Sequence, residues 1–243
     1  MIGCGEESTA PEPQQATLRL WLTDKPAAFD AVNITFTEVS AHRNNQWVVL
    51  SGQTQTVNLL DWNNGKTLLL GQAEVEAGAY TQIRLQIAAA EVVWQGQSFS
   101  LDVPSGAQSG LKLLANFEVA AGSTYDLVLD FDAQRSIVIT GPRQQPNGFK
   151  LKPVIRAAAL ALTGSISGTV VNREALPMAY AIAGGDTVTA SVIESGTGFF
   201  RLAFLPPGGY TVSIADTLGR SFLQEQVPVT AGKDFGLGTV TLQ

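Results

Sequence analysis

The chain has 243 residues, of which 45% are hydrophobic and only 15% are charged, and its formal net charge is −6. This length and apolar content predict a folded protein with one large or two modest domains, and the acidic charge argues against nucleic-acid binding, because phosphates require a basic surface. The single cysteine and the single histidine exclude an intrachain disulfide, a cysteine-built zinc site and most histidine-based catalysis.

Residues 1–15 carry the strongest indication of location. The segment Met1-Ile2-Gly3-Cys4 resembles the end of a bacterial lipoprotein signal, in which a small residue precedes the cysteine that is cleaved and lipidated. The following stretch is rich in Pro and Gln, acidic and without periodicity, which is typical of a flexible tether. The charged and apolar parts of such a signal would lie upstream of Met1. We therefore expect lipidation at Cys4; the alternative is a lone cysteine in a disordered tail.

Strand patterns begin directly after the tether. Leucines alternate with other residues over Leu18–Leu22, the period of a strand with one buried face. A second strand alternates through Val32–Phe36, but Val39 falls out of phase, which predicts a β-bulge near Thr37 and Glu38. Further strand patterns cover residues 46–50, 56–60, 83–87, 92–94, 99–103, 111–119, 127–131, 136–140 and 149–162, with turns at 63–66 and 95–96.

Three times a glycine turn leads into a tyrosine and then an apolar strand, at Tyr80, Tyr125 and Tyr210. In antiparallel sandwiches a tyrosine in this position fixes one strand across a corner, through its ring and its hydroxyl group. The spacing and the parity differ among the three, so we interpret them as one corner device used repeatedly and not as a duplicated repeat.

A boundary is expected near Thr163–Gly164, where an apolar run ends and a new strand pattern begins. Six strand patterns follow, at residues 166–171, 187–194, 199–205, 210–215, 220–227 and 235–242, which suits a small seven-strand sandwich. Helical periodicity is almost absent. The prediction is an all-β protein with a tether at 1–15, a larger antiparallel β-sandwich at 16–162 and a smaller β-sandwich at 163–243.

The second block carries the segments Gly164–Val171, Gly198–Leu202, Leu205–Val212, Val229–Gly232 and Leu237–Gly238. In these it resembles the carboxypeptidase regulatory-like family, whose members are small transthyretin-type (prealbumin-like) β-sandwiches. Thr197 replaces the aspartate that usually precedes the mid-domain glycine, and residues 178–186 fit poorly. The resemblance implies a non-catalytic accessory domain, in a superfamily grouped by fold with carbohydrate-binding modules.

The first block carries the segments Leu22–Pro26, Phe29–Val32, Ala77–Leu85, Pro104–Gly106 with Ser109–Lys112, Asp130–Ala133 and Leu151–Ile155. Over about residues 16–158 it is similar to the bacterial lipoprotein family called domain of unknown function, number 4382. This resemblance implies a secreted or lipid-anchored β-sandwich protein and assigns it no activity.

Asp126, Asp130 and Asp132 lie on one face of a predicted strand and are the weak candidates for a cation site, because Ca²⁺ prefers several oxygen ligands. An acidic stripe of this kind is more often a solvated face, and no calcium-loop motif is present. A third interpretation, which we favour, is an ion pair within the sheet between Asp130 and a basic residue such as Lys112, Arg84 or Lys152. We therefore expect neither a metal nor a cofactor.

Trp62 stands beside a polar turn and is the weak candidate for a sugar-stacking residue, with packing against the core as the default interpretation. No nucleophile–base pair or nucleophile elbow is recognisable around His42. The sequence thus predicts a non-catalytic, lipid-anchored protein of the bacterial cell envelope, a binding or structural module for glycans or a surface partner protein. The alternatives are a purely structural spacer and, less favoured, a carboxylate-dependent hydrolase.

Overall fold

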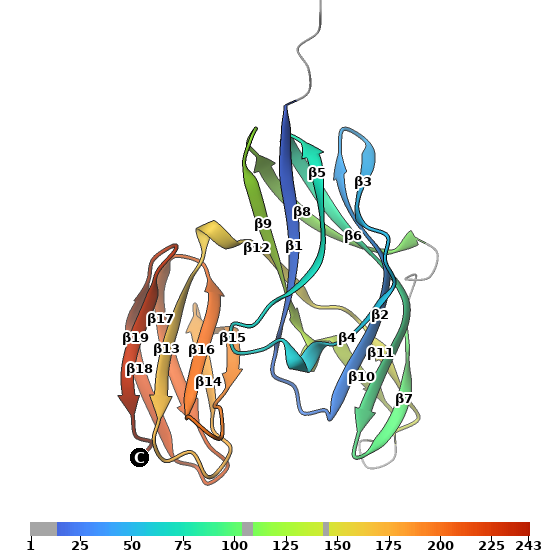
Figure 1. Cartoon of the computed structure of the whole chain (residues 1–243). Helices are drawn as coiled ribbons and strands as arrows, with labels where there is room; N and C mark the ends of the chain where they lie inside the picture. Colours follow the sequence, from blue (N-terminus) through green and yellow to red (C-terminus); the bar gives the residue numbers. More distant parts are fainter. Residues whose placement is uncertain (1–13, 104–108, 143–145) are drawn as a thin grey trace, which may run out of the picture.

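The computed structural model describes residues 14–103, 109–142 and 146–243 (Figure 1). Nearly every element in these ranges is a strand, which confirms the all-β sandwich class. No helix in the described ranges is long and apolar enough to cross a membrane. Cys4 and all but the last residues of the expected tether lie outside the described part, so the lipidation site stays a prediction.

Residues 15–162 form two packed sheets, which we call the N-terminal sandwich. One sheet has the order β12-β9-β1-β5, with β1 (Gln15–Lys25), β5 (Leu68–Glu76), β9 (Thr124–Asp132) and β12 (Ile155–Ala159). The other is built around β2 (Ala31–Arg43) and β6 (Gly78–Trp94), with β3 (Gln46–Ser51), β4 (Gln55–Asn58), β7 (Gln97–Asp102), β8 (Leu111–Val119), β10 (Ile137–Thr140) and β11 (Gly148–Leu151). The short helices are η1 (Leu59–Asp61), α2 (Ala133–Ser136) and η2 (Leu160–Leu162).

The expectation of an antiparallel larger sandwich is wrong for two strand pairs, β7 with β11 in one sheet and β1 with β9 at the centre of the other. There β1 pairs with β9 in parallel over its whole register, from Thr17 with Thr124 to Lys25 with Asp132. The reason is topological: parallel strands need a long connection, and β2 to β8 lie between β1 and β9 in the chain. Parallel pairing also places the carboxyl ends of both strands side by side.

Strand alternation sets the core of the N-terminal sandwich. Leu18, Leu20 and Leu22 of β1 are fully buried, as their period predicts. The predicted bulge in β2 is confirmed, since the register with β6 shifts between Phe36 and Glu38 and lets Val39 return to the core.

Two of the three glycine turns that lead into a tyrosine form the same corner. The Tyr80 hydroxyl donates to the Glu76 carbonyl at 2.8 Å, and the Tyr210 hydroxyl donates to the Pro206 carbonyl at 2.8 Å, each four residues upstream. At the third tyrosine, Tyr125, no such hydrogen bond forms within the described residues, although its half-buried ring stacks on Phe117 at 5.0 Å, as the Tyr80 ring does at 5.4 Å. The three-residue spacing between glycine and tyrosine accounts for this difference.

Residues 163–243 form the C-terminal sandwich, seven strands in sheets of three and four around a separate core. The three-stranded sheet contains β13 (Gly164–Val170), β16 (Phe199–Leu205) and β19 (Asp234–Val240). The four-stranded sheet contains β14 (Met178–Ala183), β15 (Asp186–Val192), β17 (Gly208–Ala215) and β18 (Ser221–Val229). The sequence patterns missed β14, because its core positions are Ala179 and Ala181, which have a low strand preference.

Candidate functional site at the joint of the two sandwiches

The parallel pair β1–β9 brings charged side chains together where both strands end. Thr23 lies opposite Asp130 in the register, and Lys25 lies opposite Asp132. The C-terminal sandwich meets this end of the N-terminal sandwich, with β15 beside the end of β1 (Figure 1). We call this region the joint.

Asp130 is 3% exposed and forms an ion pair with Arg156 of β12, whose Nη2 lies 2.7 Å from Oδ2. Burial raises the pKa of Asp130, and the Arg156 charge opposes this shift. The favoured interpretation, an ion pair within the sheet, is therefore confirmed, but the proposed partners Lys112, Arg84 and Lys152 are wrong. The true partner is Arg156 because β12, which pairs antiparallel with β9, places it directly opposite Asp130.

Asp132 is also buried, so the interpretation of the acidic stripe as a solvated face is wrong for both residues. Its Oδ2 lies 3.3 Å from Lys25 Nζ, and its Oδ1 accepts a hydrogen bond of 3.0 Å from the Arg135 amide at the start of α2. Both carboxylate oxygens are therefore occupied by partners within the N-terminal sandwich.

Asp126, the third candidate, lies away from the joint. Its carboxylate accepts two hydrogen bonds from the Arg19 guanidinium, at 2.6 and 2.7 Å, and one from Trp21 Nε1 at 2.7 Å. Partial burial would raise the pKa of Asp126, but these hydrogen bonds outweigh burial and hold the pKa below its usual value. The three aspartates thus take three separate basic partners. Among the described residues, no group of three or more His, Cys, Asp or Glu is arranged to hold a metal ion.

Asp24 is one of the acids that folding could bring to the candidate aspartates, and it does lie near Asp130 and Asp132, as the most unusual acid of the joint. It is 4% exposed; Oδ1 accepts a 3.0 Å hydrogen bond from the Ala133 amide, and Oδ2 is buried without a partner. Burial raises the pKa of Asp24 well above its usual value, and the neighbouring charges of Asp130 and Asp132 raise it further. The cavity beside it is only about 10 Å³, room for about one water molecule.

Asn64 connects the two sandwiches. It stands at the tip of the predicted turn with φ of 59°, a conformation that asparagine tolerates better than most residues. Its side-chain oxygen accepts hydrogen bonds from the Ser191 hydroxyl and the Arg201 amide, and its nitrogen donates to Glu194 at 3.1 Å. Ser191 is fully buried, so Asn64 fills a polar socket in the C-terminal sandwich.

A second connection comes from Arg156. Besides its ion pair with Asp130, its Nη1 donates to the Phe204 carbonyl in β16 at 2.8 Å. One arginine therefore satisfies a buried acid of the N-terminal sandwich and a backbone oxygen of the C-terminal sandwich. No sequence pattern singled out Arg156 or Asn64 for this role.

Trp62 is half-buried and packs against the core of the N-terminal sandwich, which agrees with the default interpretation of its sequence. Its carbonyl accepts hydrogen bonds from the Asp24 amide and the Thr23 hydroxyl, both at 2.8 Å. These bonds hold the turn that carries Asn64 against the end of β1. Whether Trp62 binds a sugar stays a prediction.

A cleft of about 520 Å³ opens at the joint. One wall comes from the loop after β1 and from α2, and the other comes from β14 and β15. Pockets of this size that lie between structural units are common ligand sites in proteins.

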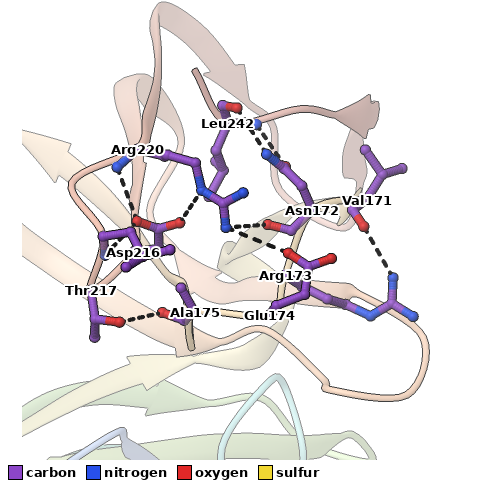
Figure 2. A network of polar contacts seen from close by, with 10 residues as sticks. Val171, Asn172, Arg173, Glu174, Ala175, Asp216, Thr217, Arg220 and Leu242 are labelled. Atoms are coloured by element: carbon purple, nitrogen blue, oxygen red, sulfur yellow. Dashed lines mark hydrogen bonds and ion pairs between the residues drawn. The ribbon is translucent and has the colours of Figure 1, made fainter.

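At the far end of the C-terminal sandwich a polar network closes the loops (Figure 2). Arg220 Nε donates to Asp216 at 2.7 Å and Nη2 donates to the Asn172 carbonyl at 3.2 Å, while the Asn172 amide exchanges two hydrogen bonds of 2.9 Å with the Leu242 backbone. These contacts tie the loop after β13 to the turn before β18 and to the chain end. Each polar group in them has a partner, so the network is structural.

The fold and the joint define a β-sandwich protein whose buried acids serve mainly to connect strands and sandwiches. The match of a family model over residues 15–153 goes further: the chain belongs to the family described as "Domain of unknown function (DUF4382)".

Among curated proteins, none matches the chain. Solved structures give weak likenesses. The Bacillus anthracis TIE protein has 13% sequence identity and a TM-score of 0.25, and the match covers 95% of this chain and 51% of that one, so this chain spans about half its length. A minor pilin of Streptococcus agalactiae has 11% identity and a TM-score of 0.23, with 94% and 95% covered. The fimbrial anchor protein of Porphyromonas gingivalis has 10% identity and a TM-score of 0.20, with 86% and 82% covered.

Proposed function

We propose that the chain is a non-catalytic, lipid-anchored module of the bacterial cell envelope that binds a glycan or a surface partner protein. The observation that carries the proposal is the joint, where Asn64 and Arg156 bridge the two sandwiches through buried or half-buried polar groups. Such bridges favour a fixed arrangement of two sandwiches over two loosely linked ones.

The path of β1 supports a role as a presenting module. This strand of 11 residues begins at the expected tether and ends at the joint, roughly 35 Å away at about 3.3 Å per residue. A lipid on Cys4 would therefore be attached at the end of the N-terminal sandwich that lies opposite the joint.

The division into a tether at 1–15 and two domains at 16–162 and 163–243 remains part of this proposal, supported by the two separate hydrophobic cores. The assignment of the second domain to the carboxypeptidase regulatory-like family also remains a proposal. The small cavity at Asp24 has no room for a substrate, so this acid gives no support to the hydrolase alternative.

Lipid anchoring is tested by expressing the chain behind a bacterial signal segment and following incorporation of labelled palmitate into the membrane fraction. We expect the label on the parent protein and its loss in Cys4→Ser. Ser8→Ala is the control, because it substitutes a residue of the same tether and leaves Cys4 in place. Label retained in Cys4→Ser would contradict the anchor.

Glycan binding is tested on a glycan array with the parent protein and the variants Trp62→Ala and Trp94→Ala. Trp94→Ala is the control, because it also removes a half-buried indole ring. Binding that depends on Trp62 and not on Trp94 supports the binding module. A folded parent protein without any signal would favour the spacer instead.

A further inference from the structure

The cleft at the joint has an apolar lining that the two sandwich cores do not require. On β14, alternation sends Ala179 and Ala181 into the core, so Met178 and Tyr180 face outward into the cleft. Ala190 and Val192 of β15 extend this surface, and the opposite wall carries Pro26 with two alanines from the loop after β1. Ala27 also packs against the core of the N-terminal sandwich, but the other apolar residues of the cleft belong to neither core. A half-buried apolar surface of this kind is typical of a binding site.

On the wall formed by the loop after β1 and by α2, the charged groups that retain hydrogen-bonding capacity are donors. Asp132 is fully engaged, because its two oxygens bind Lys25 and the Arg135 amide. Lys25 Nζ makes this one contact and retains further donors, since an ammonium group has three. The exposed Arg135 guanidinium has no hydrogen bond or ion pair within the described residues and lines the cleft.

Among the described residues that line the cleft, the one remaining charged group is Asp186, at the exposed rim on β15. Its carboxylate stands on the opposite wall from Arg135, beyond the turn that joins β14 to β15. On the wall formed by the loop after β1 and by α2, Lys25 and Arg135 therefore have N–H groups that are free to bind a ligand. They lie next to the Asp132 carboxylate, which is paired with Lys25, and next to the apolar surface.

We propose that this cleft binds a small amphipathic carboxylate, whose apolar body lies against Tyr180 and Met178 and whose carboxylate binds Arg135 and Lys25. A volume of about 520 Å³ suits a ligand of this size. The inference goes beyond the proposed function and does not depend on the lipid anchor.

The test uses isothermal titration calorimetry at neutral pH to compare three probes that have alkyl chains of the same length, namely octanoate, octanol and octylammonium. We expect octanoate to bind the full chain in a one-to-one complex and about tenfold more tightly than octanol, the difference expected for one charge-assisted hydrogen bond. Octylammonium should bind most weakly, because the wall that carries Lys25 and Arg135 is cationic.

Variants locate the site. Arg135→Gln should weaken octanoate about tenfold and leave octanol unchanged, whereas Lys150→Gln, which removes an exposed positive charge elsewhere, should change neither. Ala190→Phe should fill the cleft and abolish binding of both, with circular dichroism confirming the fold. The proposal is overturned if none of the probes binds, if octanoate and octanol bind equally, or if octanoate binding survives Ala190→Phe. None of these outcomes bears on palmitate labelling at Cys4.

Discussion

At the scale of single residues, the acids of this chain differ because of the groups that surround them. Asp130 meets an arginine across the sheet, and Asp126 receives three hydrogen bonds, so each is ionised with compensation. Asp24 has one backbone donor and an orphaned oxygen beside two other carboxylates. A buried carboxyl group in that setting is more stable when protonated.

The raised pKa of Asp24 makes a prediction about stability. Between its usual pKa of 3.8 and its raised value the folded state binds more protons than the unfolded state, so its contribution to stability falls as the pH rises through this window. Asp24→Asn should therefore increase the free energy of unfolding at neutral pH, by an amount on the order of 1 kcal/mol for each pKa unit of the shift. Urea unfolding across the pH range measures this gain, which should vanish at about pH 3, below the unfolded pKa.

Asp126→Asn is the control with the opposite sign. Its pKa is lowered in the folded state, so its contribution is present at neutral pH and is lost as the pH falls through the folded value. This variant should be less stable at neutral pH, by about 1 kcal/mol because the pair is partly exposed. Equal pH profiles for the two variants would show that Asp24 is ionised in the folded protein.

The contacts of single residues were the least predictable from the sequence. The alternation of Asp126, Asp130 and Asp132 predicted that they share a strand face, and the preference for an ion pair was correct in kind. The partner Arg156 could not be identified, because which strand lies beside β9 depends on pairing between distant segments.

At the scale of elements, the tyrosine corner is the device that both sandwiches use. In β6 and β17 the hydroxyl reaches the carbonyl four residues upstream and fixes the turn that precedes the strand. The ring is buried in the core in each case, with Tyr80 at 1% and Tyr210 at 5% exposure. The same side chain therefore contributes packing and a hydrogen bond at one place.

Removal of these hydroxyl groups gives the second prediction. Tyr80→Phe and Tyr210→Phe should each lower the free energy of unfolding by about 1 kcal/mol, because a partly buried hydrogen bond to a backbone carbonyl is lost while the ring stays in place. Tyr125→Phe is the matched control, since its ring stacks on Phe117 as that of Tyr80 does, but its hydroxyl makes no corner hydrogen bond within the described residues, so stability should change little. Chemical denaturation measures all three, and a Tyr125→Phe loss as large as the others would refute the distinction.

Most strands were predictable because alternation survives wherever one face is buried. Phe199–Leu205 was predicted to the residue, and the bulge near Thr37 was visible as a change of phase. Two strands were not predicted because their alternation is weak. β14 has alanines at its core positions, and β5 begins with three consecutive leucines. These two segments form strands because they pair with neighbouring strands, and the sequence alone does not show which strands will be neighbours.

At the scale of the whole molecule, one turn makes the largest set of side-chain contacts at the joint, and Arg156 adds a second connection. Asn64 is held by the 62–66 turn, which in turn is bonded to the end of β1, so the position of the C-terminal sandwich is tied to the central strand of the N-terminal one. The turn was predictable from its Asn-Asn-Gly sequence. Its insertion into the other sandwich was not, because the socket is assembled from β15 and β16.

Asn64→Ala gives the third prediction. The Ser191 hydroxyl and the Arg201 amide lose their acceptor, which should weaken the joint by about 2–3 kcal/mol. Hydrogen exchange of the Arg201 amide should accelerate, and the chain should expand in small-angle scattering. Asn45→Ala is the control, because Asn45 has a similar φ of 63° at an exposed turn and takes no part in the joint. Unchanged exchange at Arg201 would mean that other contacts suffice to hold the sandwiches.

The parallel pairing of β1 with β9 also has a kinetic consequence. The first strand of the chain occupies the middle of its sheet, yet its neighbour ends at Asp132, more than a hundred residues later along the chain. During synthesis, then, β1 has an open edge until more than half of the polypeptide has emerged from the ribosome. Its other edge can pair with β5 much earlier, so β1 waits as the edge strand of a β1–β5 pair, and closing the long loop to β9 is slower than forming a hairpin.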